Sequence, residues 1–355
     1  MSAVYGSTMR LNRRRLGRTL LLRQHLLDRV DATPTAMIEH LIGLQAQENL
    51  PPYLSLAARL RSFDPLAVTR GLEARELVRL LTMRGTIHLL TAQDAAMLRP
   101  WVEPRMQQEL RSSQAVGPAR EVDPEAFAAA LARVLADGPL PQREIGRRLA
   151  EAFPYPATQL GQVARLRAPL VQVPPRGEWR QSGGVIYDYV DRWTGVPLGE
   201  PAPATIVRRY LRAFGPATAA DVTAWSAVTR LGPVLSGMPD LVRYEDEDGR
   251  VLYDISDAPI ADEDVPAPVR MLGNYDNVWL SHAGRDRVTE PEARNMWIGE
   301  NRAQLHALFV DGWHEGLWRI EDDRVVIGPV RRRLTRAERA ELDEEIERVE
   351  RLLAQ

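Results

Sequence analysis

The sequence predicts an α+β protein of several small domains, in which groups of helices alternate with β-hairpins and a β-rich segment follows. Three observations predict this fold class. At 355 residues the chain exceeds the roughly 250 to 300 residues at which single hydrophobic cores stop growing. Helical spacing of apolar residues gives way to a two-stranded pattern three times along the chain. The hydrophobic fraction of 45% and charged fraction of 26% are typical of an ordinary globular protein.

In the first part of the chain, up to residue 90, the sequence predicts four helices and a hairpin. The helices are residues 16–30, residues 34–44, a segment after Pro51-Pro52 and a segment after Asp64-Pro65. Thr33 and Pro34 are typical of the cap and first residue of the second helix. Residues 77–90 form two short strands about a turn at Met83 to Gly85. Helices followed by a hairpin describe a winged helix-turn-helix.

The same order of elements recurs twice. Helices that begin at residue 124 precede a long hairpin at 171–189, and helices that begin at residue 203 precede a hairpin that turns at Asp248-Gly249. Both groups share a short repeat. The segment from Gly138 to Ile145 aligns without gaps with the segment from Gly215 to Val222. We therefore expect related modules in tandem.

The pattern changes after residue 264. A β-rich segment is followed by a helix from Thr335 to Ala354, which indicates a small closing domain with a helical tail. No apolar run approaches the roughly 20 residues that span a bilayer, so no membrane association is expected. The Arg-rich start, residues 1–23, carries charge throughout and has no cleavage site, so we interpret it as a helix. A cytoplasmic location is expected.

Cysteine and lysine are both absent, and all 46 basic residues are arginines. No thiolate nucleophile, disulfide, zinc finger or cysteine-held iron–sulfur cluster can form. No lysine amine exists to form a Schiff base, hold pyridoxal phosphate or serve a P-loop. Glycine-rich nucleotide-binding patterns and the common hydrolase motifs are also missing, so we expect no cofactor and no metal.

The net charge is −2, which argues mildly against a protein that simply coats DNA. The charges are nevertheless segregated. Arginines cluster at 10–18, 143–148, 165–180 and 331–336. Such clusters can give a neutral molecule one basic face, although solvated helix faces explain any single cluster equally well.

Gln45 and Gln47 are the first candidate site. On a continuing α-helix they would point in nearly opposite directions, whereas in an extended chain residues two apart share a face. Asn49 and Pro51 favour an extended exit from the preceding helix, so both amides can converge. The alternative is that both are exposed polar residues near a helix end.

Two further segments concentrate polar side chains. Arg84, Thr86 and His88 alternate along one face of a strand, where Arg84 could contact a phosphate and His88 a base or water. The alternative is a wing strand in which His88 is a partly buried histidine. Residues 273–287 hold His282 and Arg285 as candidate DNA contacts, among several Asp and Asn residues. A turn network is the favoured interpretation of this segment, and a metal site is not expected.

Four ordered segments resemble a known family. They are LIGLQAQENLPPYLSLAARL, LTMRGTIHLL, YDNVWLSHAGR and LFVDGWHEGLWR. Together they are similar to the winged-helix DNA glycosylases of the AlkZ/YcaQ family. The resemblance runs from about Leu11 to Arg333 and does not include residues 1–8 or the tail after Arg336.

Members of that family have three tandem winged-helix modules in a C-shaped body and a catalytic Gln-x-Gln or Gln-x-Asp motif. The resemblance therefore implies that Gln45-Ala46-Gln47 is catalytic, in the Gln-x-Gln variant associated with AlkZ-like crosslink glycosylases. It also implies excision of N-alkylated purines, including N7-alkylguanine crosslinks, from double-stranded DNA. The expected modules are residues 9–117, 118–200 and 201–263, followed by the β-rich domain at 264–355.

An amide can orient water without titrating, so we assign Gln47 to the attacking water and Gln45 to the water or the sugar. Arg176 and Arg180, on a hairpin that probes a groove, are expected to contact DNA. A base tied across the duplex cannot swing out freely, so an open cleft is expected. The expected enzyme is a monomer in the bacterial cytoplasm, associated with the nucleoid when it binds DNA. Alternatives are a non-catalytic winged-helix transcriptional regulator and a paralogue with lost or changed activity.

Overall fold

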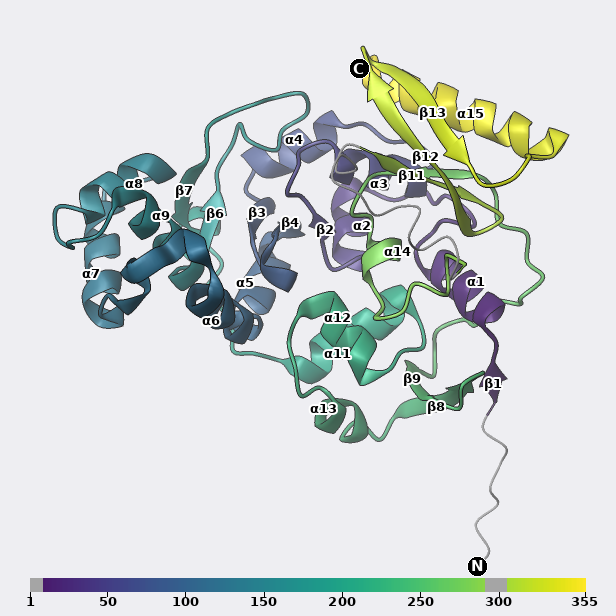
Figure 1. The fold of residues 1–355 in the computed structure, drawn as a ribbon, viewed down its shortest axis with the longest axis horizontal. Helices are drawn as coiled ribbons and strands as arrows, with labels where there is room; N and C mark the ends of the chain where they lie inside the picture. Colours follow the sequence, from purple (N-terminus) through teal and green to yellow (C-terminus); the bar gives the residue numbers. More distant parts are fainter. Residues whose placement is uncertain (1–8, 291–304) are drawn as a thin grey trace, which may run out of the picture.

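A computed structural model describes residues 9–290 and 305–355. These residues form a mixed α+β fold, in which the described strands make sheets of three, six and four strands. The predicted α+β class is confirmed (Figure 1). The count of winged-helix modules, their boundaries and a C-shaped body stay predictions. No helix of the described residues is long and apolar enough to cross a membrane.

The six-stranded sheet joins the first two predicted hairpins. Its strand order is β2 (Leu44–Gln45), β4 (Ile87–Thr91), β3 (Leu77–Leu81), β6 (Leu170–Gln172), β7 (Ile186–Tyr189) and β5 (Leu140–Pro141). The predicted strands on both sides of the Met83–Gly85 turn are confirmed. The strands of the second hairpin are shorter than expected, and residues 173–185 connect them. Arg79 of β3 pairs with Gln172 of β6, so the sheet crosses the predicted boundary at residue 117.

Helices cover this sheet and extend to one end of the molecule. The first four are α1 (Arg13–Arg23), α2 (Pro34–His40), α3 (Pro51–Arg59) and α4 (Leu66–Glu73). Five more lie between the first and second hairpins, namely α5 (Ala92–Trp101), α6 (Glu103–Ser112), α7 (Pro124–Val134), α8 (Gln142–Leu149) and α9 (Ala157–Arg167). The short α10 (Val190–Thr194) follows β7. The hydroxyl of Thr33 caps α2, as its sequence predicts.

Two of the predicted helices are too long. The first ends at Arg23 instead of residue 30, and the second ends at His40 instead of residue 44. After α2 the chain turns sharply, because Ile42 and Gly43 both have left-handed backbone angles, with φ of 53° and 92°. A side chain at position 43 would collide with Leu90. Periodicity of apolar residues does not reveal this turn, since Leu41, Ile42 and Leu44 are all buried.

The third hairpin forms a separate sheet with the start of the chain. Strands β8 (Leu241–Asp246) and β9 (Val251–Ile255) pair in antiparallel fashion, and β1 (Arg10–Leu11) pairs parallel to β8. Helices α11 (Pro203–Phe214), α12 (Ala219–Ser226) and α13 (Gly232–Ser236) lie beside it (Figure 1). A buried ion pair between Arg23 and Asp254, with an N–O distance of 2.6 Å, joins α1 to β9.

The C-terminal part of the chain contains a four-stranded antiparallel sheet and the terminal helix. The strands are β10 (Arg270–Leu272), β11 (His306–Val310), β12 (Trp313–Glu321) and β13 (Arg324–Val330). Helix α15 (Arg336–Leu353) begins with a capping box of Thr335 and Glu338, which confirms the predicted tail. Arg348 of α15 donates hydrogen bonds to the Ala57 and Arg61 carbonyls, so this helix is fixed to the end of α3.

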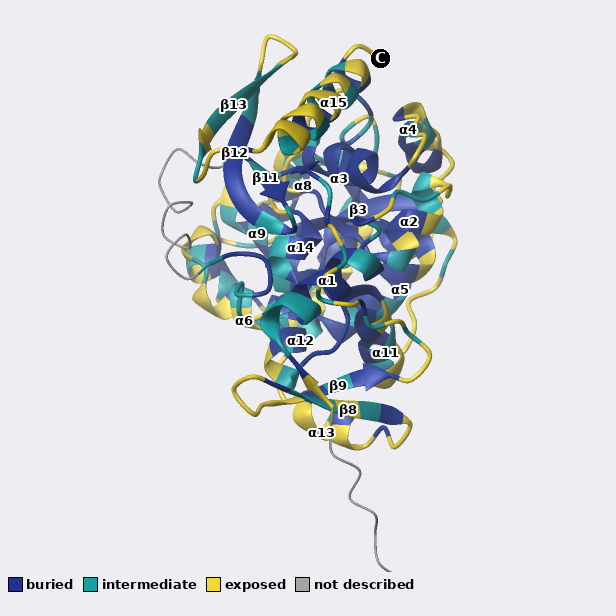
Figure 2. Ribbon diagram, turned by 90° about the vertical axis from the view of Figure 1, so that its right-hand side faces the viewer, coloured by how far each residue is buried: buried dark blue, intermediate teal, exposed yellow. Residues whose placement is uncertain are grey.

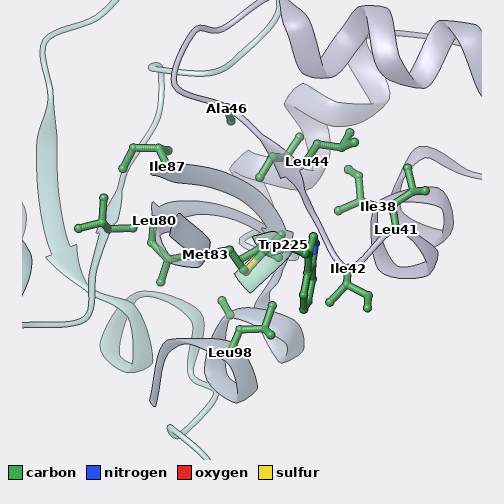
Figure 3. Packing of buried hydrophobic residues seen from close by; sticks show 14 of the residues in the cluster. Ile38, Leu41, Ile42, Leu44, Ala46, Leu80, Met83, Ile87, Leu98 and Trp225 are labelled. Atoms are coloured by element: carbon green, nitrogen blue, oxygen red, sulfur yellow. The ribbon is translucent and has the colours of Figure 1, made fainter. Parts of the chain in front are cut away.

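Buried residues are concentrated where these units meet (Figure 2). One hydrophobic cluster extends from Leu20 to Leu353 and includes both sides of the six-stranded sheet. Leu44 and Ala46 of the β2 segment belong to this cluster, as do Met83 and Trp225 (Figure 3). Because side chains alternate along an extended chain, burial of Leu44 and Ala46 directs Gln45 and Gln47 to the opposite face.

Candidate functional site

The predicted Gln-Ala-Gln segment forms the edge of the six-stranded sheet. The sharp turn at Ile42-Gly43 leads directly into β2, where Gln45 pairs with His88 of β4. The backbone N–H of Ala46 continues this pairing by donating to the Ile87 carbonyl at 2.7 Å. The extended exit predicted for this segment is confirmed. Gln45 is buried, with 8% of its surface exposed, and Gln47 is exposed.

The protein holds both glutamine side chains by their carbonyl oxygens. Gln45 Oε1 accepts a hydrogen bond from Arg84 Nη2 at 2.9 Å, and Gln47 Oε1 accepts one from the Ile87 backbone N–H at 3.2 Å. Donors on β4 and the β3–β4 turn therefore fix both amides. The hairpin that the sequence predicts at residues 77–90 is the platform on which the Gln-Ala-Gln segment lies.

Arg84 and His88 lie behind Gln45 rather than on the outer surface. Arg84 occupies the β3–β4 turn with φ of 57°, and its guanidinium contacts Gln45, His88 Nε2 at 3.1 Å and the Trp225 carbonyl. Burial lowers the pKa of Arg84 to about 10. Burial, and then the charge of Arg84, hold the pKa of His88 well below its ordinary value, so this imidazole is neutral.

A second buried arginine supports the middle of the motif. Arg79 on β3 donates a hydrogen bond from Nη2 to the Ala46 carbonyl at 2.8 Å. Only 2% of Arg79 is exposed, and burial, helped by the charge of Arg176, lowers its pKa to about 10. Gly177 packs directly on this side chain, where a Cβ atom would lie 2.3 Å from Arg79 Cδ.

Asn277 positions the turn before β2. This buried residue begins α14 (Asn277–Leu280), and its Nδ2 donates to the Gly43 carbonyl at 2.8 Å. The preceding Asp276 caps α14 and forms a buried ion pair with Arg59 of α3 at 2.7 Å. The favoured interpretation of residues 273–287, a turn network, is therefore correct for Asp276 and Asn277. Sequence reasoning missed that this network supports Gln45, because the partners are more than 200 residues apart.

The other predicted DNA contacts have different surroundings. Arg176 and Arg180 lie in the connection between β6 and β7, where Arg176 donates to the Gly183 carbonyl and Arg180 pairs with Asp323 at 3.1 Å. The guanidinium of Arg285 lies 4.8 Å from the centre of the Trp279 ring. His282 is buried, its Nδ1 lies 3.0 Å from Ser281 Oγ, and burial lowers its pKa. The structure does not bring these four residues into contact with the glutamines.

A cavity of about 330 Å³ lies beside the exit of the motif. It is lined by Asn49, Leu50 and Tyr53 after the motif, by residues 178–181, and by Ile320, Asp323 and Leu353 of the C-terminal part of the chain. Asn49 Nδ2 donates to the Gln181 carbonyl at 3.2 Å across one wall. Among residues 9–290 and 305–355, no three His, Asp or Glu side chains are grouped to hold a metal ion.

Comparisons with known proteins agree with the resemblance in the four sequence segments. A family model described as DNA glycosylase AlkZ-like matches residues 38–352. The interstrand DNA cross-link repair glycosylase of Streptomyces sahachiroi is 25% identical over 339 residues, which cover 86% of this chain and 87% of that protein. The solved structure of Streptomyces sahachiroi DNA glycosylase AlkZ has the same fold, with a TM-score of 0.81 and 22% identity over 98% of both chains. Because the family model covers most of the sequence, the chain belongs to the AlkZ-like family of DNA glycosylases.

Proposed function

We propose that this enzyme is a monofunctional DNA glycosylase that uses water to hydrolyse the N-glycosidic bond of N7-alkylpurines, including those in interstrand crosslinks. One observation carries the proposal. In a member of a DNA glycosylase family, Gln45 lies on the edge strand β2 and Gln47 lies two residues further on, and a hydrogen bond fixes each amide. The related Streptomyces protein is named for interstrand crosslink repair, which supports the same class of lesion here.

The chemistry of the lesion explains why amides suffice. Alkylation at N7 puts a positive charge on the purine, so the base leaves readily and needs no strong general acid. The site must then position water and the reacting groups, and fixed amide dipoles contribute by preorganisation. His88 is the imidazole beside Gln45, and its lowered pKa keeps it neutral and unsuited to donate a proton near pH 7.

Double-stranded DNA that contains alkylated purines is the proposed partner of a monomeric, cytoplasmic enzyme. Arg180, Arg176 and Arg285 are the proposed phosphate contacts, and binding would exchange the exposed pair of Arg180 and Asp323 for a phosphate. His88 and His282 are buried, so we propose that they support neighbouring side chains and do not touch DNA in this conformation.

The proposal is tested by incubating the protein with a duplex that contains one N7-methylguanine, followed by hot alkali. Alkali cleaves the strand wherever a base has been removed, so cleavage at the lesion is expected, and none is expected in the unmodified duplex. A second duplex with an N7-alkylguanine crosslink tests the wider substrate range. A non-catalytic regulator, the alternative function, would bind DNA and leave both lesions intact; nothing in the comparisons favours it.

The absence of lysine predicts what remains after the base has left. Bifunctional glycosylases attack the sugar with an amine and form a Schiff base, which borohydride traps. Here the sole amine is the chain's N-terminus, which lies outside the described residues. We expect an intact abasic strand and no trapped protein–DNA adduct, with a lysine-dependent glycosylase as positive control. An adduct formed by protein with an acetylated N-terminus would contradict attack by water.

A further inference from the structure

The identity of the fixed atom on each glutamine follows from its partner. The guanidinium of Arg84 and the backbone N–H of Ile87 can only donate hydrogen bonds. The amide atoms 2.9 Å and 3.2 Å from them are therefore the carbonyl oxygens of Gln45 and Gln47. The orientation of both amides is set by this chemistry and does not depend on telling oxygen from nitrogen.

The opposite end of each amide is free. Gln45 Nε2 has no hydrogen-bond partner among the described residues. It is not completely buried, so it is in contact with solvent. Gln47 is exposed. The motif thus offers amide N–H donors outward, while its carbonyl oxygens are engaged by the protein.

Arg84 is held in place by further hydrogen bonds, so the Gln45 amide cannot easily flip to exchange its oxygen and nitrogen. Its guanidinium also donates to the Trp225 carbonyl on α12 and to His88 Nε2. Because Arg84 only donates, His88 Nε2 must accept, and the imidazole proton is on Nδ1, which donates to the Thr86 carbonyl at 3.0 Å. In the described part of the chain no carboxylate pairs with Arg84, so its positive charge acts directly on the Gln45 carbonyl.

We infer that Gln45 donates its amide N–H to the departing purine at N3, and that Arg84 is a positioning residue that fixes this orientation. The inference rests on the proposed glycosylase function and revises the expected assignment of Gln45 to the water or the sugar. A developing oxocarbenium would need the carbonyl end of the amide, and that end faces Arg84. The N–H end instead matches an electron-rich acceptor.

The reaction is balanced without any added reactant. The C1′–N9 bond breaks and its electron pair goes to the purine, whose N7 charge it neutralises. Electron density rises at N9 and at the neighbouring N3, which accepts the Gln45 N–H. Water forms the new bond to C1′ and releases its proton to solvent.

The first experiment compares Gln45→Glu with Gln45→Ala in single-turnover excision of N7-methylguanine. Glutamate has nearly the same shape but offers no N–H, so both variants should fall about 100-fold, a typical loss for one positioned donor. A Gln45→Glu variant at least tenfold faster than Gln45→Ala would overturn the inference, because a carbonyl or carboxylate would then be the active end.

The second experiment is a double-mutant cycle of Arg84 and Gln45. Arg84→Met alone should slow excision about tenfold, and in the Gln45→Ala background it should slow it less than twofold further. Duplex affinity and melting temperature of each variant are measured alongside, since a merely structural role would change them. Additive losses would show that Arg84 does not act through Gln45.

The substrate arm replaces N7-methylguanine with N7-methyl-3-deazaguanine, which lacks the N3 acceptor. Deletion of N3 should slow the wild-type enzyme at least tenfold more than it slows Gln45→Ala. Equal slowing of both would overturn the assignment to N3. A wild-type protein that excises neither base overturns the proposed function, whereas an active wild-type protein with no coupling overturns only the role given to Gln45.

Discussion

Replacement of either Gln45 or Gln47 by alanine is expected to slow single-turnover excision of N7-methylguanine about 100-fold or more, while duplex affinity stays within a few fold. Each change removes one fixed amide from the β2 edge and leaves the hairpin beneath it in place. Positioned groups of this kind commonly contribute rate factors of about 10² to 10³. Rapid-quench excision and fluorescence anisotropy with the same duplex measure the two quantities.

Gln108→Ala is the matched control. This exposed glutamine on α6 makes no side-chain contact to the motif, so its replacement should change neither rate nor affinity. Undiminished excision by both motif variants would remove the catalytic assignment. A parallel loss of affinity would show instead that the amides bind the ground state.

Acid is expected to destabilise the protein as soon as the pH falls below about 6, before most of its carboxylates are protonated. Burial lowers the pKa of His306 and His314 to about 4, and holds the pKa values of His88 and His282 below their ordinary range. All four are neutral in the folded state at pH 6, but in the unfolded chain they take up protons below about pH 6.5. Stability is therefore lost as the pH falls.

Each such histidine lowers the free energy of unfolding by up to about 1.4 kcal/mol for every unit that the pH falls below about 6, until its folded-state pKa is reached. Four histidines together lower it by up to roughly 5 kcal/mol per unit. Domain stabilities are commonly about 5 to 15 kcal/mol, so this loss is sufficient for unfolding. Circular dichroism melts at half-unit steps of pH measure it. His306→Gln should reduce the pH slope by about one proton, and a melting temperature that is constant from pH 7 to 5 would contradict the prediction.

The sequence predicted the elements that depend on residues close together in the chain, such as helix starts and tight turns. Thr33 caps its helix as expected, the terminal helix begins at Thr335 as expected, and the two strands on either side of Met83–Gly85 form the expected hairpin. These outcomes depend on neighbours within a few residues, which a sequence displays directly. The extended exit that carries Gln45 was predicted for the same reason, from the proline that follows it.

Long-range contacts account for what the sequence did not reveal. The left-handed turn at Ile42-Gly43 is held by Asn277, and the guanidinium that orients Gln45 is held by Trp225. Neither partner is identifiable from residue type or spacing, because burial and separation are set by the folded core. The sequence shows that Arg84 is charged but not that it is held inside the fold, so it was predicted to contact a phosphate. In the structure its guanidinium is directed at the side-chain amide of Gln45.

The parallel pairing of β1 with β8 affects how the chain can fold as it is synthesised. The first strand finds its partner only when Glu245 and Asp246 have left the ribosome, more than 230 residues later. Until then Arg23 also lacks Asp254, and closing so large a loop carries an entropic cost that local helices do not bear. Residues 10–23 therefore lack these partners, and stay partly accessible to protease, while the β3–β4 hairpin and its helices assemble. A nascent chain arrested before residue 240 should lose this leading segment to protease first.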